Sequence, residues 1–380
     1  MNEVNLLALV IQTPGALPPC VWGPPGIGKS ARFAQLAKTL NLDLETVIAS
    51  IRDPSDFAGL PVPENGHGVR LEPPSWAVRC AKAGKGLVFF DEASTAPPAT
   101  QAALLRVVLE RWVGDCQLPE GVKIALAANP TEQAAGGWDL SAPMANRLVH
   151  LQWSAPSVES WTDWLSGLGS ESKIPVIDLK TWEKEFSQAK ALASAFLRRR
   201  PGLLSEDVSK VAGRFPLAYA TPRTWECAVR LLASCRAVGY TDEVLPLLSG
   251  CIGEPVSLEF AKWLRENDLP DPEALLKDPA SWTPNEKQPD RAFAVCLAVT
   301  DCAISNQDRK SATGKKIAAQ RWHAAWRVLD RAMAIGKDIV AIAARRLADP
   351  QYLPEGGMIS PEVREVIGKI REVVSAAGTI

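Results

Sequence analysis

The segment from Gly23 to Ser30 reads Gly-Pro-Pro-Gly-Ile-Gly-Lys-Ser and fits the spacing G-x-x-x-x-G-K-[ST]. Glycines at this spacing let backbone N–H groups curl around phosphate oxygens, while the lysine reaches the β- and γ-phosphates and the serine hydroxyl ligates Mg²⁺. An apolar run precedes the segment and helical periodicity over 29–40 follows it, so a helix N-terminus adds partial positive charge. We therefore predict a phosphate-binding loop formed by Gly23, Pro24, Pro25, Gly26, Ile27, Gly28, Lys29 and Ser30.

Two adjacent carboxylates, Asp91 and Glu92, follow the apolar run 87–90. Four consecutive large apolar residues are typical of a buried strand, and its carboxyl end would lie beside the phosphate loop. Asp91 is then expected to hold Mg²⁺ together with Ser30, and Glu92 to polarise the water that attacks the γ-phosphate.

Asn129 ends the next apolar run, 124–128. A short amide at this position can hydrogen-bond the attacking water or the γ-phosphate. The residue also precedes Pro130, so on its own it is explained equally well as a turn residue. Its place relative to the other two motifs favours the functional interpretation.

A parallel sheet wrapped by helices is needed to bring these side chains together. The first part of the chain alternates apolar runs with helix-like stretches, and the predicted strands are 18–22, 46–50, 87–90, 123–128 and 148–153. Beyond Pro156 amphipathic helical segments take over, at 158–168, 179–200, 222–238, 243–251, 255–266, 290–304, 314–348 and 360–376. The predicted fold class is α/β, with a nucleotide-binding core over 1–155, a helical lid over 156–268 and a helical C-terminal extension over 269–380.

These motifs resemble the AAA+ ATPases, whose Walker A, Walker B and sensor-1 positions they match, and the finer pattern is similar to the MoxR-like branch. The segment 145–148, Ala-Asn-Arg-Leu, resembles the family's segment before its last core strand, which makes Arg147 the expected arginine finger. The segment 221–225, Thr-Pro-Arg-Thr-Trp, resembles the start of the lid helix, which implies that Arg223 reaches the γ-phosphate as sensor 2. The segment 142–147 lacks the acid that often precedes the finger, so Arg111 stays an alternative.

Two further segments resemble insertions of the same branch. Residues 60–71 predict two short strands around a Glu-Asn-Gly-His-Gly turn, in the place of the family's helix-2 insert. Residues 110–118 resemble the hairpin that precedes sensor 1. In a ring both hairpins would project towards the central pore, where His67 could touch a client. An ordinary surface hairpin stays the alternative for the first.

The resemblance implies a Mg-ATP hydrolase that acts in a ring, six-membered as in relatives, and remodels or activates a protein partner. In relatives that partner is often a von Willebrand A domain protein. The resemblance covers about residues 17–265 and leaves the C-terminal extension unassigned. Two other classes of function stay open: a nucleic-acid motor, and a nucleotide-gated scaffold with little need for turnover.

Composition favours a protein partner. Among 380 residues, 42 Lys and Arg stand against 43 Asp and Glu, which excludes a generally basic nucleic-acid coat. The eight cysteines form no C-x-x-C pair and no histidine lies near them at ligand spacing, so we expect reduced thiols in the cytoplasm and no zinc site. We also expect neither a membrane span nor a signal peptide.

Several tryptophans lie at helical spacing. The stretch 309–331 interleaves basic residues with Trp322 and Trp326, a pattern that nucleic-acid binding would use but that a buried helix stripe explains better. Trp161, Trp164 and Trp263 are likewise expected to pack between helices of the lid.

Overall fold

The computed structural model describes residues 3–376 except 65, 67, 131–137, 168–173, 208–217, 242–243, 306 and 355–358. Asn65 and His67, at the tip of the first predicted hairpin, therefore lie outside the described residues. The chain forms two compact units: Met1–Asp178 with Leu204–Leu258, here the sheet unit, and Leu179–Leu203 with Glu259–Ile380, here the helical unit. The three-part division expected from sequence stays a prediction, and its borders differ from those of these units.

The sheet unit is built on five parallel strands in the order β2-β5-β8-β1-β9. The strands are β1 Pro19–Trp22, β2 Leu44–Ile48, β5 Gly86–Asp91, β8 Val122–Ala128 and β9 Val149–Gln152. The central strands are almost wholly apolar because both of their faces are buried, as in other parallel sheets. With the glycine-rich loop between β1 and a helix, this confirms the predicted α/β fold class: a P-loop NTPase core followed by helical regions.

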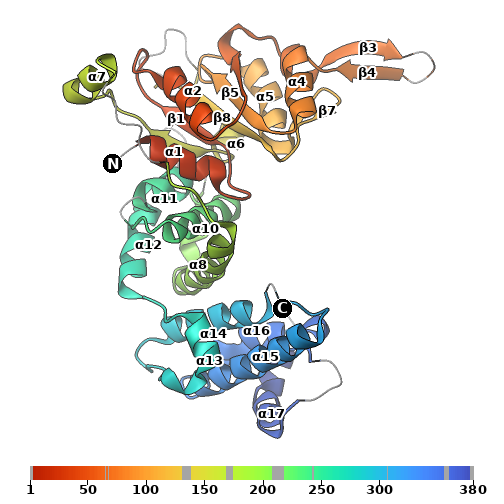
Figure 1. Cartoon of the computed structure of the whole chain (residues 1–380), viewed down its shortest axis with the longest axis vertical. Coiled ribbons are helices and arrows are strands. Elements are labelled where there is room, and N and C mark those ends of the chain that lie inside the picture. Colours follow the sequence, from red (N-terminus) through yellow and green to blue (C-terminus); the bar gives the residue numbers. More distant parts are fainter. Residues whose placement is uncertain are drawn as a thin grey trace. The chain divides into compact units, whose positions relative to one another are not determined.

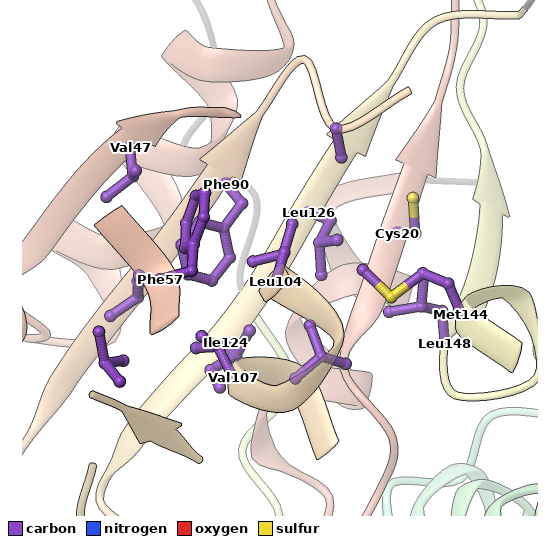
Figure 2. Packing of buried hydrophobic residues seen from close by; sticks show 14 of the residues in the cluster. Cys20, Val47, Phe57, Phe90, Leu104, Val107, Ile124, Leu126, Met144 and Leu148 are labelled. Carbon is purple, nitrogen blue, oxygen red and sulfur yellow. The ribbon is translucent and has the colours of Figure 1, made fainter. Parts of the chain in front are cut away.

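The sheet unit also contains helices, most of which contribute buried residues to its core. They are α1 Glu3–Gln12, α2 Lys29–Thr39, α3 Ser55–Ala58, α4 Ser75–Ala83, α5 Pro98–Glu110, α6 Ala142–Ala145, α7 Val158–Leu165, α10 Pro222–Ala237 and α11 Val244–Ile252. Figure 2 shows one side of the core, where Leu104 and Val107 of α5 meet Phe90, Ile124 and Leu126 of the sheet. Each of these five side chains is almost fully buried, so the strand ends that carry the site rest on a close-packed base.

Both predicted hairpins are present. The first pairs β3 Leu60–Glu64 with β4 Gly68–Glu72 and projects from the sheet unit (Figure 1), and the second pairs β6 Trp112–Val113 with β7 Cys116–Gln117. The base of the first hairpin is hydrogen-bonded to the turn of the second: the Asp115 N–H donates to the Leu71 carbonyl at 2.9 Å, and the Leu71 N–H donates to Asp115 Oδ2 at 2.8 Å. A Cβ on Gly114 would stand 2.5 Å from the Leu71 carbonyl oxygen, so this close approach requires glycine.

The helical unit consists of α8 Leu179–Arg199, α13 Pro272–Lys277, α14 Pro289–Ile304, α15 Ala312–Ala332, α16 Lys337–Leu347 and α17 Pro361–Ala376, and α12 Glu254–Glu266 crosses the border between the units. A buried carboxylate joins three of these helices. Asp301 of α14 is 2% exposed and forms ion pairs with Lys190 of α8, at 2.7 Å, and Arg346 of α16. This explains why α8 belongs with the C-terminal helices although it is far from them in sequence.

Some sequence expectations need correction. The stretch 314–348 is two helices, which separate before the helix-start residue Gly336, and the predicted strand 46–50 ends at Ile48, so Ser50 lies in the 3₁₀ helix η1 Ala49–Ile51. Trp263, Trp322 and Trp326 are buried as predicted. Trp161 and Trp164 are not: they are 48% and 63% exposed, because no residue of the short helix α7 is buried.

Among the described residues, no helix is both long enough and apolar enough to cross a membrane.

Candidate nucleotide-binding site

The register of the sheet brings three strand ends to one edge. Trp22, the last residue of β1, pairs with Ala128, and Phe90 near the end of β5 pairs with Leu126. The residues that follow these strands are the phosphate-loop segment, Asn129 and the Asp91–Glu92 pair, so all of them leave the sheet side by side. Crevices at the carboxyl ends of parallel strands are the usual ligand site of open α/β sheets.

The loop between β1 and α2 has the conformation that its glycines allow. Gly26 and Gly28 have φ values of 80° and 88°, in the left-handed region, and a Cβ on either would meet no atom within 4 Å. Gly23 is needed for a different reason, since a Cβ there would lie 2.7 Å from the Trp153 carbonyl oxygen. The first amides of α2 have no partner within the helix and Gly28 offers no side-chain cap, so these N–H groups and the open space above the glycines suit a phosphate chain.

Lys29 is folded into the loop. Its Nζ donates to the carbonyl oxygens of Gly23 at 2.7 Å and Pro24 at 3.0 Å, and to Asn129 Oδ1 at 2.6 Å. Burial lowers the pKa of Lys29, while the carboxylates of Asp91 and Glu92 act in the opposite direction. All three acceptors are neutral oxygens, so a phosphate anion in the loop would offer this ammonium group a stronger partner.

Ser30 and Asp91 form the oxygen pair expected around Mg²⁺. Ser30 Oγ donates to Asp91 Oδ2 at 2.6 Å, across the gap between α2 and β5, and Asp91 Oδ1 accepts from the Glu92 N–H at 2.9 Å. A hydroxyl and a carboxylate are hard oxygen ligands, and Mg²⁺ commonly keeps several waters and uses only one or two such groups with substrate phosphates. These two residues fit that role.

Glu92 has a backbone conformation that is rare for its residue type. Its φ is 56°, in the left-handed region, where non-glycine residues are uncommon and cluster at functional sites. Its side chain accepts a hydrogen bond from the hydroxyl of Ser50, which lies in η1 beyond the end of β2. No sequence pattern singles out Ser50, because only the pairing of β2 with β5 places it beside Glu92.

Asn129 is held by a serine that the sequence analysis did not identify. Ser94 Oγ donates to the Asn129 carbonyl at 3.0 Å and accepts from the Asn129 N–H at 3.1 Å. Ser94 is 1% exposed and follows Glu92 by two residues, so its position after the acidic pair was the available signal. This backbone clamp aims the Asn129 amide at Lys29 and the phosphate loop.

Arg147 and Arg223 lie together, at the edge formed by the amino ends of the strands, opposite the carboxyl ends that carry the phosphate loop. Arg147 precedes β9, whose first residue pairs with Pro19 at the start of β1, whereas the phosphate loop follows the end of that strand. Four strand residues separate the two edges by roughly 13 Å. Arg223 Nη1 donates to Asn146 Oδ1 at 3.4 Å, which places it beside Arg147 and not beside Lys29.

The two arginines have unused donor capacity. Arg147 Nη1 donates to the Pro143 carbonyl at 2.6 Å, while its Nε has no hydrogen-bond partner within the described part of the chain. Burial, and to a lesser extent the charge of Arg223, lowers the pKa of Arg147. Neither arginine forms an ion pair with a carboxylate of the described residues.

Arg111, the alternative finger, is engaged inside the sheet unit. Its guanidinium donates to the carbonyl oxygens of Leu118, at 3.2 Å, and of Pro119 and Val122. Burial lowers the pKa of this group. The three carbonyls hold the guanidinium against the second hairpin, so its donors are already engaged within the chain.

No family model and no curated protein matches this sequence. Among solved structures, a proposed ATPase of Cytophaga hutchinsonii is 17% identical over 97% of this chain and 88% of its own, with a TM-score of 0.32. A full-length MCM homologue of Methanopyrus kandleri is 18% identical, with a TM-score of 0.34, over 70% of this chain and 54% of its own length. At such identities and TM-scores, function has to be argued from the geometry of the site.

Proposed function

We propose that this protein is a Mg-ATP hydrolase of the AAA+ type, similar to the MoxR-like branch. The observation that carries the proposal is the convergence at one sheet edge of Lys29 on Asn129, at 2.6 Å, and of Ser30 on Asp91, also at 2.6 Å. One pair offers a cation and an amide to phosphate oxygens, and the other offers a hydroxyl and a carboxylate to a metal ion.

In the proposed mechanism the phosphate loop positions the nucleotide and the strand ends position the water. Lys29 leaves its carbonyl partners and pairs with the β- and γ-phosphates, while Ser30 and Asp91 hold the metal. Mg²⁺, when bound, neutralises charge on the phosphate oxygens as the transferred group separates. Glu92 orients the attacking water and accepts its proton, which requires the carboxylate to turn away from Ser50.

The arginines extend the proposal to an assembly. Arg147 and Arg223 lie at the edge of the sheet opposite their own phosphate loop, so we infer that both serve the nucleotide site of a neighbouring copy. Charge compensation from a second subunit explains why an isolated chain should hydrolyse ATP slowly. A closed ring, six-membered as the resemblance implies, would give every site such a neighbour.

The cellular role is proposed as remodelling or activation of a protein partner in the cytoplasm, where a von Willebrand A domain protein is the partner class that the resemblance implies. Burial of Trp322 and Trp326 argues against a nucleic-acid motor, because neither ring is available for stacking on bases. The cations around them are engaged as well: Arg321 pairs with Glu273, and Arg331 donates to the Trp282 carbonyl.

The test is nucleotide binding and turnover by the full chain. Lys29→Ala should abolish Mg-ATP binding, whereas Lys38→Ala, an exposed lysine of the same helix, should leave it unchanged. Glu92→Gln should bind ATP with wild-type affinity and stall, and light scattering should show assembly that ATP promotes. Undiminished hydrolysis by Glu92→Gln would contradict its role as base, and ATP binding by Lys29→Ala would contradict the site itself.

A further inference from the structure

A buried histidine connects the two edges of the sheet. His150 is the second residue of β9, is 6% exposed and uses both of its ring nitrogens. The Trp22 indole Nε1–H donates to His150 Nδ1 at 3.0 Å, and His150 Nε2 lies 2.9 Å from the Ala145 carbonyl oxygen. Since Nδ1 accepts, the ring proton is on Nε2 and is donated to Ala145.

The partners of this histidine adjoin the two functional segments. Trp22 is the last residue of β1 and directly precedes Gly23, the first residue of the phosphate loop. Ala145 ends α6 and precedes Arg147 by two residues. One imidazole therefore ties the strand that carries the phosphate loop to the turn that carries Arg147.

The connection is built from groups that have little freedom. Trp22 is 2% exposed, and burial lowers the pKa of His150 to about 4, so the ring stays neutral and keeps its tautomer near neutral pH. The backbone of His150 also packs closely against Gly250 of α11. A Cβ on this glycine would stand 2.2 Å from the His150 carbonyl oxygen, so the approach requires glycine. Breaking either hydrogen bond would leave a buried polar group without a partner, which is costly.

The side chain of Arg147 itself makes few hydrogen bonds within the described part of the chain. Its Nη1 donates to the Pro143 carbonyl, within its own turn, and its Nε has no partner among the residues described. The turn itself is short, because α6 spans only Ala142–Ala145. The bond from His150 to Ala145 thus helps to fix this turn to the sheet near the arginine, together with the buried side chains of Met144 and Leu148.

We propose that His150 is a positioning residue for Arg147: through its bonds to Trp22 and Ala145 it sets the arginine of one subunit for catalysis in the neighbouring subunit. The inference rests on the proposed function, since it takes from there the action of Arg147 on a second copy. Displacements near 1 Å in a positioned catalytic group cost up to about a hundredfold in rate. His150 makes no contact with nucleotide in this role, and its effect is on turnover and not on binding.

The experiment mixes full-length subunits that are each inactive. Subunits with Glu92→Gln cannot use their own site but carry an intact Arg147, and subunits with Arg147→Ala have an intact site but no finger. Mixing the two should restore ATP turnover at the sites of the second kind. Adding His150→Phe to the Glu92→Gln subunits should lower the restored kcat roughly tenfold or more, with the nucleotide Kd unchanged.

Milder and matched variants complete the test. Trp22→Phe, which removes only the indole donor, should lower the restored kcat by a few-fold, and His150→Gln, which keeps a donor and an acceptor, should recover part of the loss from His150→Phe. The control is Thr13→Val in the same subunits, because Thr13 also makes two buried hydrogen bonds in the sheet unit, to the Leu9 carbonyl and Ser234 Oγ. It should leave the restored turnover at its full value.

The outcomes separate the two proposals. If mixing Glu92→Gln with Arg147→Ala restores no turnover, the action of Arg147 on a neighbour is wrong. If turnover is restored, and restored equally with His150→Phe or Trp22→Phe present, the positioning role of His150 is wrong while the proposed function stands. Should His150→Phe fail to fold by circular dichroism, full restoration by Trp22→Phe subunits would by itself overturn the inference.

Discussion

Two groups of arginines in this protein look alike in sequence and differ in the structure. In the helical unit, Arg321 donates two hydrogen bonds to the carboxylate of Glu273, both at 2.7 Å, and Arg327 pairs with Glu362 at 3.1 Å. In the sheet unit, Arg147 and Arg223 adjoin each other at Asn146, and neither has a carboxylate partner in the described part of the chain. The first group is internally neutralised, whereas the second is a local excess of positive charge.

The difference shows what a basic sequence can and cannot indicate. The stretch 309–331 has the higher density of cations, yet Arg321 and Arg331 within it bond to other segments of the helical unit. Two arginines far apart in sequence make the uncompensated site, because α10 and the turn before β9 bring them together. An uncompensated pair of this kind is suited to an anion supplied from outside the chain, and phosphate is one of the anions that guanidinium groups bind in two-point geometry.

The largest expected effect is on the uncompensated pair. Arg147→Ala should lower kcat by roughly 10³-fold in the assembled protein, because a finger arginine compensates charge that develops only in the transition state. Nucleotide affinity should stay unchanged. The free energy of unfolding should change by less than about 0.5 kcal/mol, as for other surface substitutions away from a packed network. Steady-state turnover together with urea unfolding checks both statements, and a stable variant with wild-type turnover would place the finger elsewhere.

The matching change in the helical unit should have the opposite profile. Arg321→Ala should reduce the free energy of unfolding by about 2 kcal/mol, since it removes a two-point, partly buried charge pair. Turnover should remain within about twofold of wild type. Loss of turnover without loss of stability would mean that the 309–331 arginines do contact a ligand, and the contrast between the two groups would be lost.

His150, which lies between the two edges, should make the free energy of unfolding depend on pH. Burial lowers the pKa of His150 to about 4, against a usual value near 6.5, so below pH 6.5 the unfolded chain binds a proton that the folded chain does not. Stability is therefore full above pH 6.5 and falls as the pH decreases towards 4. Between pH 7 and pH 5 the loss from this group should be about 2 kcal/mol. Urea midpoints measured in wild type and His150→Phe check this, since the variant should lose that part of the slope.

The smallest effect is expected at an exposed pair. Arg327 and Glu362 have side chains that are 55% and 72% exposed, so Arg327→Ala should change the free energy of unfolding by no more than about 0.5 kcal/mol. DNA or RNA should change turnover neither in wild type nor in this variant. If nucleic acid stimulated the turnover of wild type and Arg327→Ala abolished this stimulation, the helical unit would contain the ligand-binding arginines, and the contrast between the two groups would be wrong.

The strand ends of the site could be predicted from the sequence because the signals are local. Apolar runs ending in Gly23, Asp91 and Asn129 mark buried strands, and parallel strands place their carboxyl ends on one edge. The first hairpin was predictable for the same reason, from short runs around turn residues, whereas the second was expected from the family resemblance.

Side chains that complete the site from other segments were not predictable. Ser50 was assigned to the end of a strand and instead lies in η1, where it reaches Glu92 only because β2 pairs with β5. Ser94 clamps Asn129 through a contact between two loops. Ser50 carries no distinguishing signal in the sequence, and the only signal for Ser94 is its position two residues after Glu92.

The tryptophans show where the limit lies. Trp322 with Trp326, and Trp161 with Trp164, have the spacing of one helix face, and the same prediction of burial was made for both pairs. The first pair is 1% exposed at each residue because α15 packs on other helices, while the second lies on α7, which buries none of its residues. Periodicity shows which side chains share a face, but not whether anything covers that face.

By itself the sequence predicted the chemistry of the phosphate edge: the expected loop, metal ligands and base each depend on residue type and short spacing. The tertiary structure decided what accompanies that chemistry. It placed Arg147 and Arg223 together on the other edge, engaged Arg111 with three carbonyls and set His150 between the edges. Such arrangements arise from packing between segments that are remote in the chain, and no local pattern encodes which remote partner a side chain will meet.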